Sequence, residues 1–418
     1  MITERRIILQ NAGKINPESI DNYISSGGYL SAAKALGRPG SEIIEEIIKS
    51  GLRGRGGAGF PAGLKARYTQ QTVTKEAQKY LVCNADEGEP GTFKDRVIIE
   101  NDPHLLIEGI IIAAYSIGAT KAFIYLRGEY FKSIYLITRA IQQCEVRGYL
   151  GKNIFGSDFS LDIEVRQGAG SYLCGEELTL LESLEGKRGY PRIKPPFPAE
   201  KGLFGAPTLV YNVETVANLP RIIEKGSGWF SSIGSKDSSG TKIFTISGDV
   251  NNPGFFEVEM GATIRELIYG LAGGISENRK FKAALLGGVA GTFIDESVLD
   301  TPAGYDSLKA KGATLGSGAI IVLDETRDIL QMTRSILKFF SHESCGKCVP
   351  CRIGTTRLNA VIEDIIKKQN RTTSNLDALV SEADYIAKTS LCPLGQSPVL
   401  PLRSLKRYFN HEFLSDEA

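Results

Sequence analysis

The sequence has few of the features that would direct a protein into a membrane or onto a nucleic acid. Its 49 Lys and Arg residues nearly balance 48 Asp and Glu residues, so no basic field favours nucleic acid. The most apolar run, Leu105 to Ile117, is too short to cross a bilayer and contains Glu108. Residues 1–6 lack the apolar stretch of a signal peptide. We therefore expect a cytoplasmic protein without nucleic-acid binding or direct membrane insertion, at most peripheral to a membrane-bound complex.

Histidine is also scarce, and the cysteines are odd in number. There are only three histidines, and no Ser, His and Asp arrangement typical of nucleophilic catalysis is apparent. The seven cysteines are an odd number in a chain of 418 residues, which argues against a disulfide framework. Four of them fall in the last quarter, which indicates a metal site. The length predicts roughly two or three domains.

Glycine, in contrast, is concentrated in one stretch, Gly51 to Lys65, which also carries Arg53 and Arg55. Such a backbone can approach a flat or charged group closely, and its N–H groups suit a phosphate. Residues 54–59 match G-x-G-x-x-G, but a Rossmann fingerprint follows a strand. Here the apolar spacing over Ser41–Ser50 predicts a helix instead. We interpret the stretch as a cofactor loop of another kind; the alternative is a flexible surface linker.

The first half of the chain alternates strand and helix patterns. Strands are predicted at Lys79–Cys83, Ala122–Leu126 and Phe159–Arg166, with a helix starting at Pro103 and another over Tyr130–Val146. This alternation predicts an α/β domain. Acidic residues follow the strands at positions where open α/β sheets bind ligands. These residues are Asp86, Glu87, Glu89, Glu176 and Glu177. Carboxylates there would bind ribose hydroxyls and favour NAD over NADP; the alternative is a solvated acidic loop.

The second half separates into two further parts. Residues 226–240 are rich in Gly and Ser, and we interpret them as a linker. A small α+β unit follows, and the chain is mostly helical from Asp324 onward. We therefore predict domains at 1–225, 241–323 and 324–418.

The cysteine spacing is the most specific signal. Cys345, Cys348 and Cys351 are separated by two residues each, and Cys392 supplies a distant fourth thiol. Three closely spaced ligands with one remote ligand suit a 4Fe–4S cluster. Structural zinc, which prefers two paired C-x-x-C hooks, is the alternative.

Together these motifs carry a family resemblance over nearly the whole chain. The sequence resembles the NADH-binding flavoprotein subunit of respiratory complex I and its relatives in NAD-dependent hydrogenases and formate dehydrogenases. The matching stretches are residues 51–61, 83–87, 174–177, 212–215 and the four cysteines. The resemblance implies a flavin-binding Rossmann-like α/β domain, then a ubiquitin-like β-grasp (SLBB) domain, then a C-terminal helical bundle that carries the iron–sulfur cluster.

The resemblance also implies cofactors and site residues. The flavin mononucleotide (FMN) would be held by Gly54, Gly56, Gly57, Lys65, Asn84, Asp86, Tyr172, Gly175, Glu176, Asn212 and Thr215. NAD(H) would contact Phe60, Lys65, Tyr68, Glu87, Glu89, Glu177, Lys194 and Phe197. A hydride would pass between NAD(H) and FMN with no catalytic side chain, because the flavin does the chemistry. Electrons would then pass singly to one 4Fe–4S cluster.

The resemblance leaves the assembly open. Electrons are expected to leave through a thioredoxin-like 2Fe–2S subunit and a further iron–sulfur or catalytic subunit of a complex I-like, hydrogenase or formate dehydrogenase assembly. An electron-bifurcating complex that also uses ferredoxin is an alternative, and a zinc-stabilised, non-catalytic scaffold is a hypothesis of another class. The sequence departs from the family pattern at Ala66, at Tyr211, where a second Asn is usual, and at Pro393, where Gly or Ala is commoner.

Overall fold

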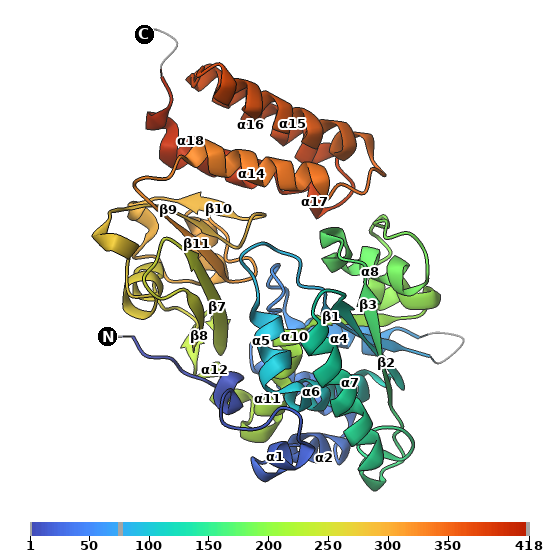
Figure 1. Cartoon of the computed structure of the whole chain (residues 1–418). Coiled ribbons are helices and arrows are strands. Elements are labelled where there is room, and N and C mark those ends of the chain that lie inside the picture. The colour runs from blue at the N-terminus through green and yellow to red at the C-terminus, as the bar shows by residue number, and fades with distance from the viewer. Residues whose placement is uncertain (1, 74–77, 415–418) are drawn as a thin grey trace.

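The computed structural model describes residues 2–73 and 78–414; the predicted domain limits at residues 1 and 418 lie outside them. Figure 1 shows the N-terminal α/β part on one side of the molecule, a second sheet beside it and a layer of helices from the C-terminal part above both. The predicted succession of α/β, small α+β and helical parts is confirmed. The three domain boundaries themselves stay predictions.

The first sheet is parallel and four-stranded, in the order β3-β2-β1-β4. Its strands are β1 (Tyr80–Ala85), β2 (Lys121–Arg127), β3 (Asp162–Gly168) and β4 (Thr208–Asn212). This is the order of the first four strands of a Rossmann fold, so the prediction of a Rossmann-like sheet is confirmed. The sequence reasoning missed β4, whose five residues follow a long Pro- and Gly-rich loop. Its neighbour β1 lies where the strand order reverses, and ligands bind at such a point.

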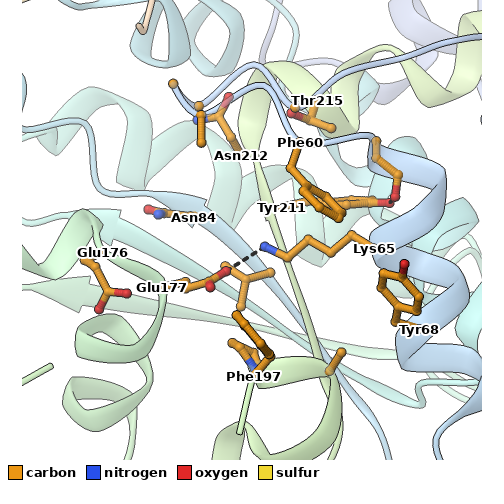
Figure 2. A pocket seen from close by; sticks show the side chains of 18 of the residues that line it. Phe60, Lys65, Tyr68, Asn84, Glu176, Glu177, Phe197, Tyr211, Asn212 and Thr215 are labelled. Carbon is orange, nitrogen blue, oxygen red and sulfur yellow. Dashed lines mark hydrogen bonds and ion pairs between the residues drawn. The ribbon is translucent and has the colours of Figure 1, made fainter. Parts of the chain in front are cut away.

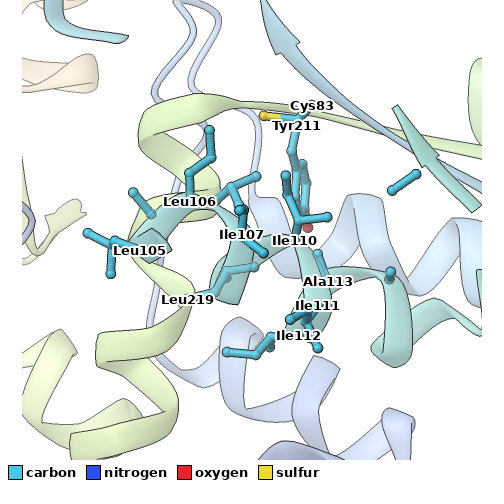
Figure 3. Close-up of a cluster of buried hydrophobic side chains, with 14 of the residues drawn as sticks. Cys83, Leu105, Leu106, Ile107, Ile110, Ile111, Ile112, Ala113, Tyr211 and Leu219 are labelled. Carbon is cyan, nitrogen blue, oxygen red and sulfur yellow. The ribbon is translucent and has the colours of Figure 1, made fainter. Parts of the chain in front are cut away.

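Helices cover this sheet on both faces. They are α1 (Ile20–Ser25), α2 (Leu30–Leu36), α3 (Gly40–Lys49), α4 (Ala62–Gln71), α5 (Lys94–Asn101), α6 (Pro103–Ile117), α7 (Phe131–Val146), α8 (Glu177–Leu184), α9 (Pro198–Lys201), α10 (Val213–Ala217) and α11 (Leu219–Lys225). Helix α6 is buried almost all round, which its continuous apolar sequence requires. Figure 3 shows its side chains packed with Cys83, Tyr211 and Leu219. Asp102 is the N-cap of α6, because its side chain accepts a hydrogen bond from the backbone N–H of Leu105.

The charged residue inside that apolar run is fully satisfied. The Glu108 carboxylate accepts hydrogen bonds from the Tyr23 hydroxyl and from the backbone N–H of Ala32. A buried carboxylate is tolerated only with such partners. No helix in residues 2–73 and 78–414 is long and apolar enough to cross a membrane.

The second sheet is five-stranded and mixed, in the order β10-β9-β11-β7-β8. Its strands are β7 (Thr241–Gly248), β8 (Gly254–Glu259), β9 (Phe281–Leu286), β10 (Thr292–Ile294) and β11 (Ala319–Asp324). A π-helical segment (Glu266–Leu271) and α13 (Tyr305–Ala310) cover it. The buried Glu257 of β8 accepts hydrogen bonds from the backbone N–H groups of Ile7, Ile8 and Leu9, which fastens the N-terminal segment to this sheet.

The prediction of a linker at residues 226–240 is wrong. These residues form α12 (Ser227–Ser231) and a short hairpin of β5 (Gly234–Ser235) and β6 (Ser238–Ser239). Phe230 is fully buried, and Trp229 packs against the apolar core around the parallel sheet and α6. Two apolar anchors therefore outweigh the Gly and Ser content, and the segment is part of the packed structure.

The C-terminal part is a helical bundle with its own apolar core. It contains α14 (Ile329–His342), α15 (Val349–Lys367), α16 (Thr373–Thr389), α17 (Pro393–Gln396) and α18 (Val399–Phe409). The apolar faces of α14 and α15 are buried in this core. Helix α18 packs on the second sheet, where the Ser404 hydroxyl accepts a hydrogen bond from the backbone N–H of Phe293.

Candidate functional site

A cavity of about 910 Å³ opens at the carboxyl ends of β1 and β4. Asn84 of β1 and Asn212 of β4 are paired in the sheet register, and both line the cavity. This is the point at which the strand order reverses, the usual ligand site of an open α/β sheet. The volume lies within the range of small-molecule and cofactor pockets.

One wall of the cavity is the glycine loop, which joins α3 to α4. Its ends are tied together, because the Gly54 N–H donates to the Phe60 carbonyl and the Ala62 N–H donates to the Leu52 carbonyl. A side chain on Gly59 would be strained at its φ of +65° and would place Cβ 2.5 Å from the Tyr305 ring. The Tyr305 hydroxyl in turn donates to the Gly54 carbonyl. The loop is thus a shelf that Tyr305 supports. It is not a Rossmann fingerprint, as expected, because a helix and not a strand precedes it.

The other side of the cavity carries an ionic clamp. The Glu177 carboxylate forms ion pairs with Lys65 Nζ at 2.6 Å and with Lys194 Nζ at 2.8 Å. Lys194 Nζ also forms an ion pair with Glu176 at 2.9 Å. Burial alone would raise the pKa of Glu177, but the two ammonium groups lower it to about 2. Figure 2 shows Lys65 reaching across the cavity toward Glu177. The two ammonium groups could also form charge-assisted hydrogen bonds to a phosphate-bearing ligand.

Aromatic rings stand around the mouth of the cavity. Phe60, Tyr68 and Phe197 line it and are each about half exposed (49%, 53% and 52%). A flat heterocycle can stack on exposed rings of this kind. Shelf, clamp and rings together therefore fit a dinucleotide with a second flat cofactor.

Most residues predicted for the two ligands line this one cavity. From the FMN set these are Gly54, Gly56, Gly57, Lys65, Asn84, Gly175, Glu176, Asn212 and Thr215. From the NAD(H) set they are Phe60, Lys65, Tyr68, Glu177, Lys194 and Phe197. The lining residues that sequence reasoning did not assign to a ligand include Gln71, Thr72, Ala199, Glu200, Tyr211 and Pro393. A sign that Tyr211 and Pro393 belong to the site was present in the sequence, since both stand at positions where this chain departs from the family pattern.

The structure places Asp86, Glu87, Glu89 and Tyr172 outside the set that lines the cavity. The Glu87 carboxylate accepts hydrogen bonds from the backbone N–H groups of Asp95 and Arg96 at the start of α5. Glu89 accepts from the Tyr172 hydroxyl at 2.6 Å and from the backbone N–H of Ala290 at 2.9 Å. These partners give both glutamates structural roles, and their ligand roles stay predictions.

Asp86 has a buried carboxylate oxygen that is unsatisfied among the described residues. Its Oδ2 is buried and has no hydrogen-bond partner within the described part of the chain. Burial raises the pKa of Asp86 from 3.8 to about 7. A buried acceptor without a partner is costly, and a hydroxyl or N–H group of a bound ligand would satisfy it. Asp86 is not among the residues that line the cavity, so its ligand role stays a prediction.

The Asp86 pKa makes a testable prediction for the ligand-free protein. Between about pH 4 and pH 7 the folded state holds more protons than the unfolded state, so stability falls as the pH rises through this window. Asp86→Asn removes the buried charge and should raise the free energy of unfolding at pH 8 by about 2 kcal/mol. Urea unfolding at several pH values measures this. Asp158→Asn, at an exposed site, is the control, and an equal gain in both variants would contradict the prediction.

The four cysteines belong to two segments of the C-terminal bundle. Cys345 and Cys348 lie in the loop before α15, Cys351 is in its first turn, and Cys392 is the N-cap of α17. The two segments touch, because a Cβ on Gly395 would lie 3.0 Å from Cys351 Cβ. Burial raises the pKa of Cys392 to about 11, while the backbone N–H groups of Leu394 and Gly395 act in the opposite direction. Such N–H groups are the donors that tune a thiolate-bound cluster.

Among the described residues, no group of three or more His, Cys, Asp or Glu side chains is placed so as to hold a single metal ion. The thiols of Cys345 and Cys348 are nevertheless near enough to raise the pKa of Cys351 through their charge, after burial as the main cause. Three of the ligands predicted for the cluster thus interact with one another. Cys392 also interacts electrostatically with Cys351 and Cys345.

The cysteine region forms part of the ligand cavity. Pro393, directly after Cys392, lines the cavity wall. Lys347, between two of the cysteines, donates from Nζ to the Pro191 carbonyl at 2.8 Å, on the loop that leads to Lys194. A redox cofactor in the cavity would therefore lie against the segment that holds the fourth thiol.

Comparisons with known proteins agree with this arrangement. Residues 47–221 match the family described as Nuo51 FMN-binding domain, residues 243–290 match the SLBB domain, and residues 331–416 match the NADH-ubiquinone oxidoreductase-F iron-sulfur binding region. An NADH-quinone oxidoreductase subunit of Aquifex aeolicus is 48% identical over 94% of this chain and 90% of its own length. The chain belongs to the family of NADH-binding flavoprotein subunits of NADH-quinone oxidoreductase.

Hydrogenase subunits are similar to this chain as well. The NADP-reducing hydrogenase subunit HndC of Solidesulfovibrio fructosivorans is 45% identical over 98% of this chain and 82% of its own length. A solved NAD⁺-reducing [NiFe]-hydrogenase in the H₂-reduced state covers 99% of the chain and 69% of the solved chain, with a TM-score of 0.84 and 33% identity. The resemblance inferred from the motifs is therefore confirmed, as are FMN, a 4Fe–4S cluster and NADH as the substrate. This member of the family is an oxidoreductase flavoprotein that oxidises NADH through FMN and a 4Fe–4S cluster.

Proposed function

We propose that this chain exchanges a hydride between NAD(H) and FMN within the cavity and sends the electrons singly through the Cys345, Cys348, Cys351 and Cys392 cluster. The observation that supports this is the position of Pro393, which lines the cavity and follows the cluster ligand Cys392. Bound FMN supplies the hydride acceptance and the change from two-electron to one-electron transfer. The protein supplies alignment, charge and exclusion of water.

The cavity residues divide into two groups in this proposal. The glycine shelf, with Asn84, Asn212 and Thr215, holds FMN through close backbone approach and hydrogen bonds. Phe60, Tyr68 and Phe197 stack on the nucleotide at the mouth. No side chain is needed as acid or base, because bound FMN would supply the hydride chemistry.

The ionic clamp binds the phosphates of NAD(H). Lys65 and Lys194 share the Glu177 carboxylate, and Lys194 also pairs with Glu176. A diphosphate can take over part of this contact as a charge-assisted partner. The three acidic residues around the clamp would repel a further phosphate, which favours NADH over NADPH. They are Glu176, Glu177 and Glu200.

Lys194→Met tests the clamp. Loss of one ammonium weakens phosphate binding and frees Glu177 to repel the nucleotide, so the KM for NADH should rise about tenfold at unchanged kcat and FMN content. Steady-state kinetics with an artificial acceptor measure this. Lys187→Met is the matched control, because Lys187 lies on the same loop but pairs with Glu185. A fall in kcat with an unchanged KM would contradict the assignment.

The partners and the location follow from the same proposal. Electrons leave the cluster to a thioredoxin-like 2Fe–2S subunit and a further iron–sulfur or catalytic subunit, in a complex I-like, hydrogenase or formate dehydrogenase assembly. The chain works in the cytoplasm, free or at the periphery of a membrane-bound complex. Native mass spectrometry of the purified complex tests this, since it identifies the neighbouring subunits and their metals. Isolation of the chain as a monomer that reduces its acceptor unaided would contradict it.

The central experiment is an anaerobic titration of the reconstituted chain with NADH. The proposal requires that NADH bleaches the bound flavin and then reduces the cluster. Bleaching of the flavin by NADPH at the same concentration, or no bleaching by NADH, would overturn the stated specificity or the function itself.

A further inference from the structure

Beneath the cavity lies a buried ion cluster that the proposed chemistry does not use. It consists of Lys94, Asp95, Glu214 and Lys242, whose side chains are at most 5% exposed. Lys94 Nζ lies 2.7 Å from Asp95 and 3.0 Å from Glu214, and Lys242 Nζ lies 2.5 Å from the same Glu214 carboxylate. Two cations and two anions are thus joined in one chain of contacts.

Such a cluster is weak evidence for stability. Removing charges from water costs several kcal/mol per ion, and well-packed apolar residues often serve stability as well or better. The better-attested use of buried polar groups is to fix one arrangement among several. We therefore expect this cluster to hold a neighbouring polar group in one orientation.

The group is the amide of Asn212 at the cavity wall. Its Oδ1 accepts from Lys94 Nζ at 3.0 Å and from the backbone N–H of Glu214 at 3.0 Å, and its Nδ2 donates to Asp95 Oδ2 at 2.6 Å. The side chain also faces the glycine shelf, since a Cβ on Gly56 would lie 3.1 Å from Asn212 Cβ. The cluster therefore determines the orientation of an amide that lines the cavity.

The far end of the cluster belongs to another part of the fold. Lys242 is the second residue of β7, on the second sheet. Glu214 of α10 also accepts from the backbone N–H of Ile243 at 2.9 Å, so its carboxylate joins the first domain to β7 by two contacts. The contacts run without a break from β7 to the cavity wall.

We propose that Lys94, Asp95, Glu214 and Lys242 are positioning residues of the FMN site, through which the second sheet fixes the Asn212 amide for flavin binding. This inference rests on the proposed assignment of Asn212 to FMN. None of the four side chains lines the cavity, so each acts on the ligand through Asn212. The SLBB part of the chain is thereby a component of the flavin site and more than a spacer.

Lys242→Met in the full chain is the first test. The variant keeps the length of the side chain but leaves Glu214 with one fewer partner, so FMN should dissociate about tenfold more readily. Quenching of FMN fluorescence on reconstitution measures the affinity. Glu257→Gln is the matched control, because Glu257 is an equally buried carboxylate on the adjacent strand β8 whose partners among the described residues are the N-terminal segment and Thr241. This control should bind FMN like the wild type.

A double-mutant cycle separates positioning from general destabilisation. In an Asn212→Ala background, Lys242→Met should weaken FMN binding less than twofold further, because the amide it positions is gone. An undiminished tenfold effect in that background would overturn the proposal, and so would wild-type affinity in Lys242→Met itself. If Lys242→Met fails to fold by circular dichroism, Asp95→Asn replaces it with the same expected outcomes, since Asp95 accepts directly from Asn212.

Failure of the proposed function is distinguishable from failure of this inference. If the wild-type chain does not bind FMN, the assignment of the cavity is wrong. If the wild type binds FMN and the two variants bind it equally well, only the positioning role is wrong.

Discussion

Cys392→Ser should leave the reduction of bound FMN by NADH within about twofold of the wild-type rate and should lower electron delivery to the partner subunit by about 100-fold or more. The serine cannot supply the fourth thiolate, and the cluster is lost or altered. The cavity itself keeps its shelf, clamp and rings, because only Pro393 of this segment reaches it. Stopped-flow bleaching of the flavin measures its reduction by NADH, and the iron content of the purified protein measures the loss of the cluster.

The control for this variant is Cys144→Ser. Cys144 is fully buried and lies 2.9 Å from the Tyr29 hydroxyl, a contact that serine can replace. It should retain iron and both activities. Full iron content in Cys392→Ser, with unchanged transfer to the partner, would show that another residue completes the cluster.

Gly59→Val should lower the affinity for FMN by about 100-fold. The φ of +65° is strained for any side chain and most for a β-branched one. The new Cβ would also lie 2.5 Å from the Tyr305 ring, which supports the shelf through its hydrogen bond to Gly54. Ring and loop cannot both stay in place, so the backbone that approaches the flavin moves. Equilibrium dialysis or fluorescence quenching with FMN measures the loss.

Gly118→Val shares the backbone strain without the clash. Gly118 ends α6 at a φ of +76°, and a Cβ there would meet nothing within 4 Å. Both variants should lose thermal stability, but only Gly59→Val should lose FMN. Equal affinities for FMN in the two variants would contradict the role given to the shelf.

Much of this architecture could be predicted from the sequence because its signals are local. The apolar run from Leu105 to Ile117, the helix start at Pro103 and the x₂ spacing of the cysteines each reflect contacts within a few residues. The helix before the glycine loop likewise excluded a Rossmann fingerprint at that place. Motifs of this kind identify elements and ligands without knowledge of the tertiary fold.

The remaining features depend on residues far apart in the chain. The acidic character of Glu87 and Glu89 was visible, but their partners at α5 and at Ala290 are set by packing. Tyr305 and Pro393 contribute to the shelf and to the wall from more than 200 residues away. In residues 226–240, the burial of Phe230 could not be inferred from a composition dominated by Gly and Ser.

The distribution of the cavity wall along the chain has a consequence for biosynthesis. Its first contributor is Gly54 and its last is Pro393, in a chain of 418 residues. A nascent chain on the ribosome therefore lacks part of the pocket until Pro393 has been translated. Flavin can thus enter a finished pocket only after Cys392 has been synthesised, so the pocket is completed at the stage at which the last of the four thiols becomes available for cluster assembly.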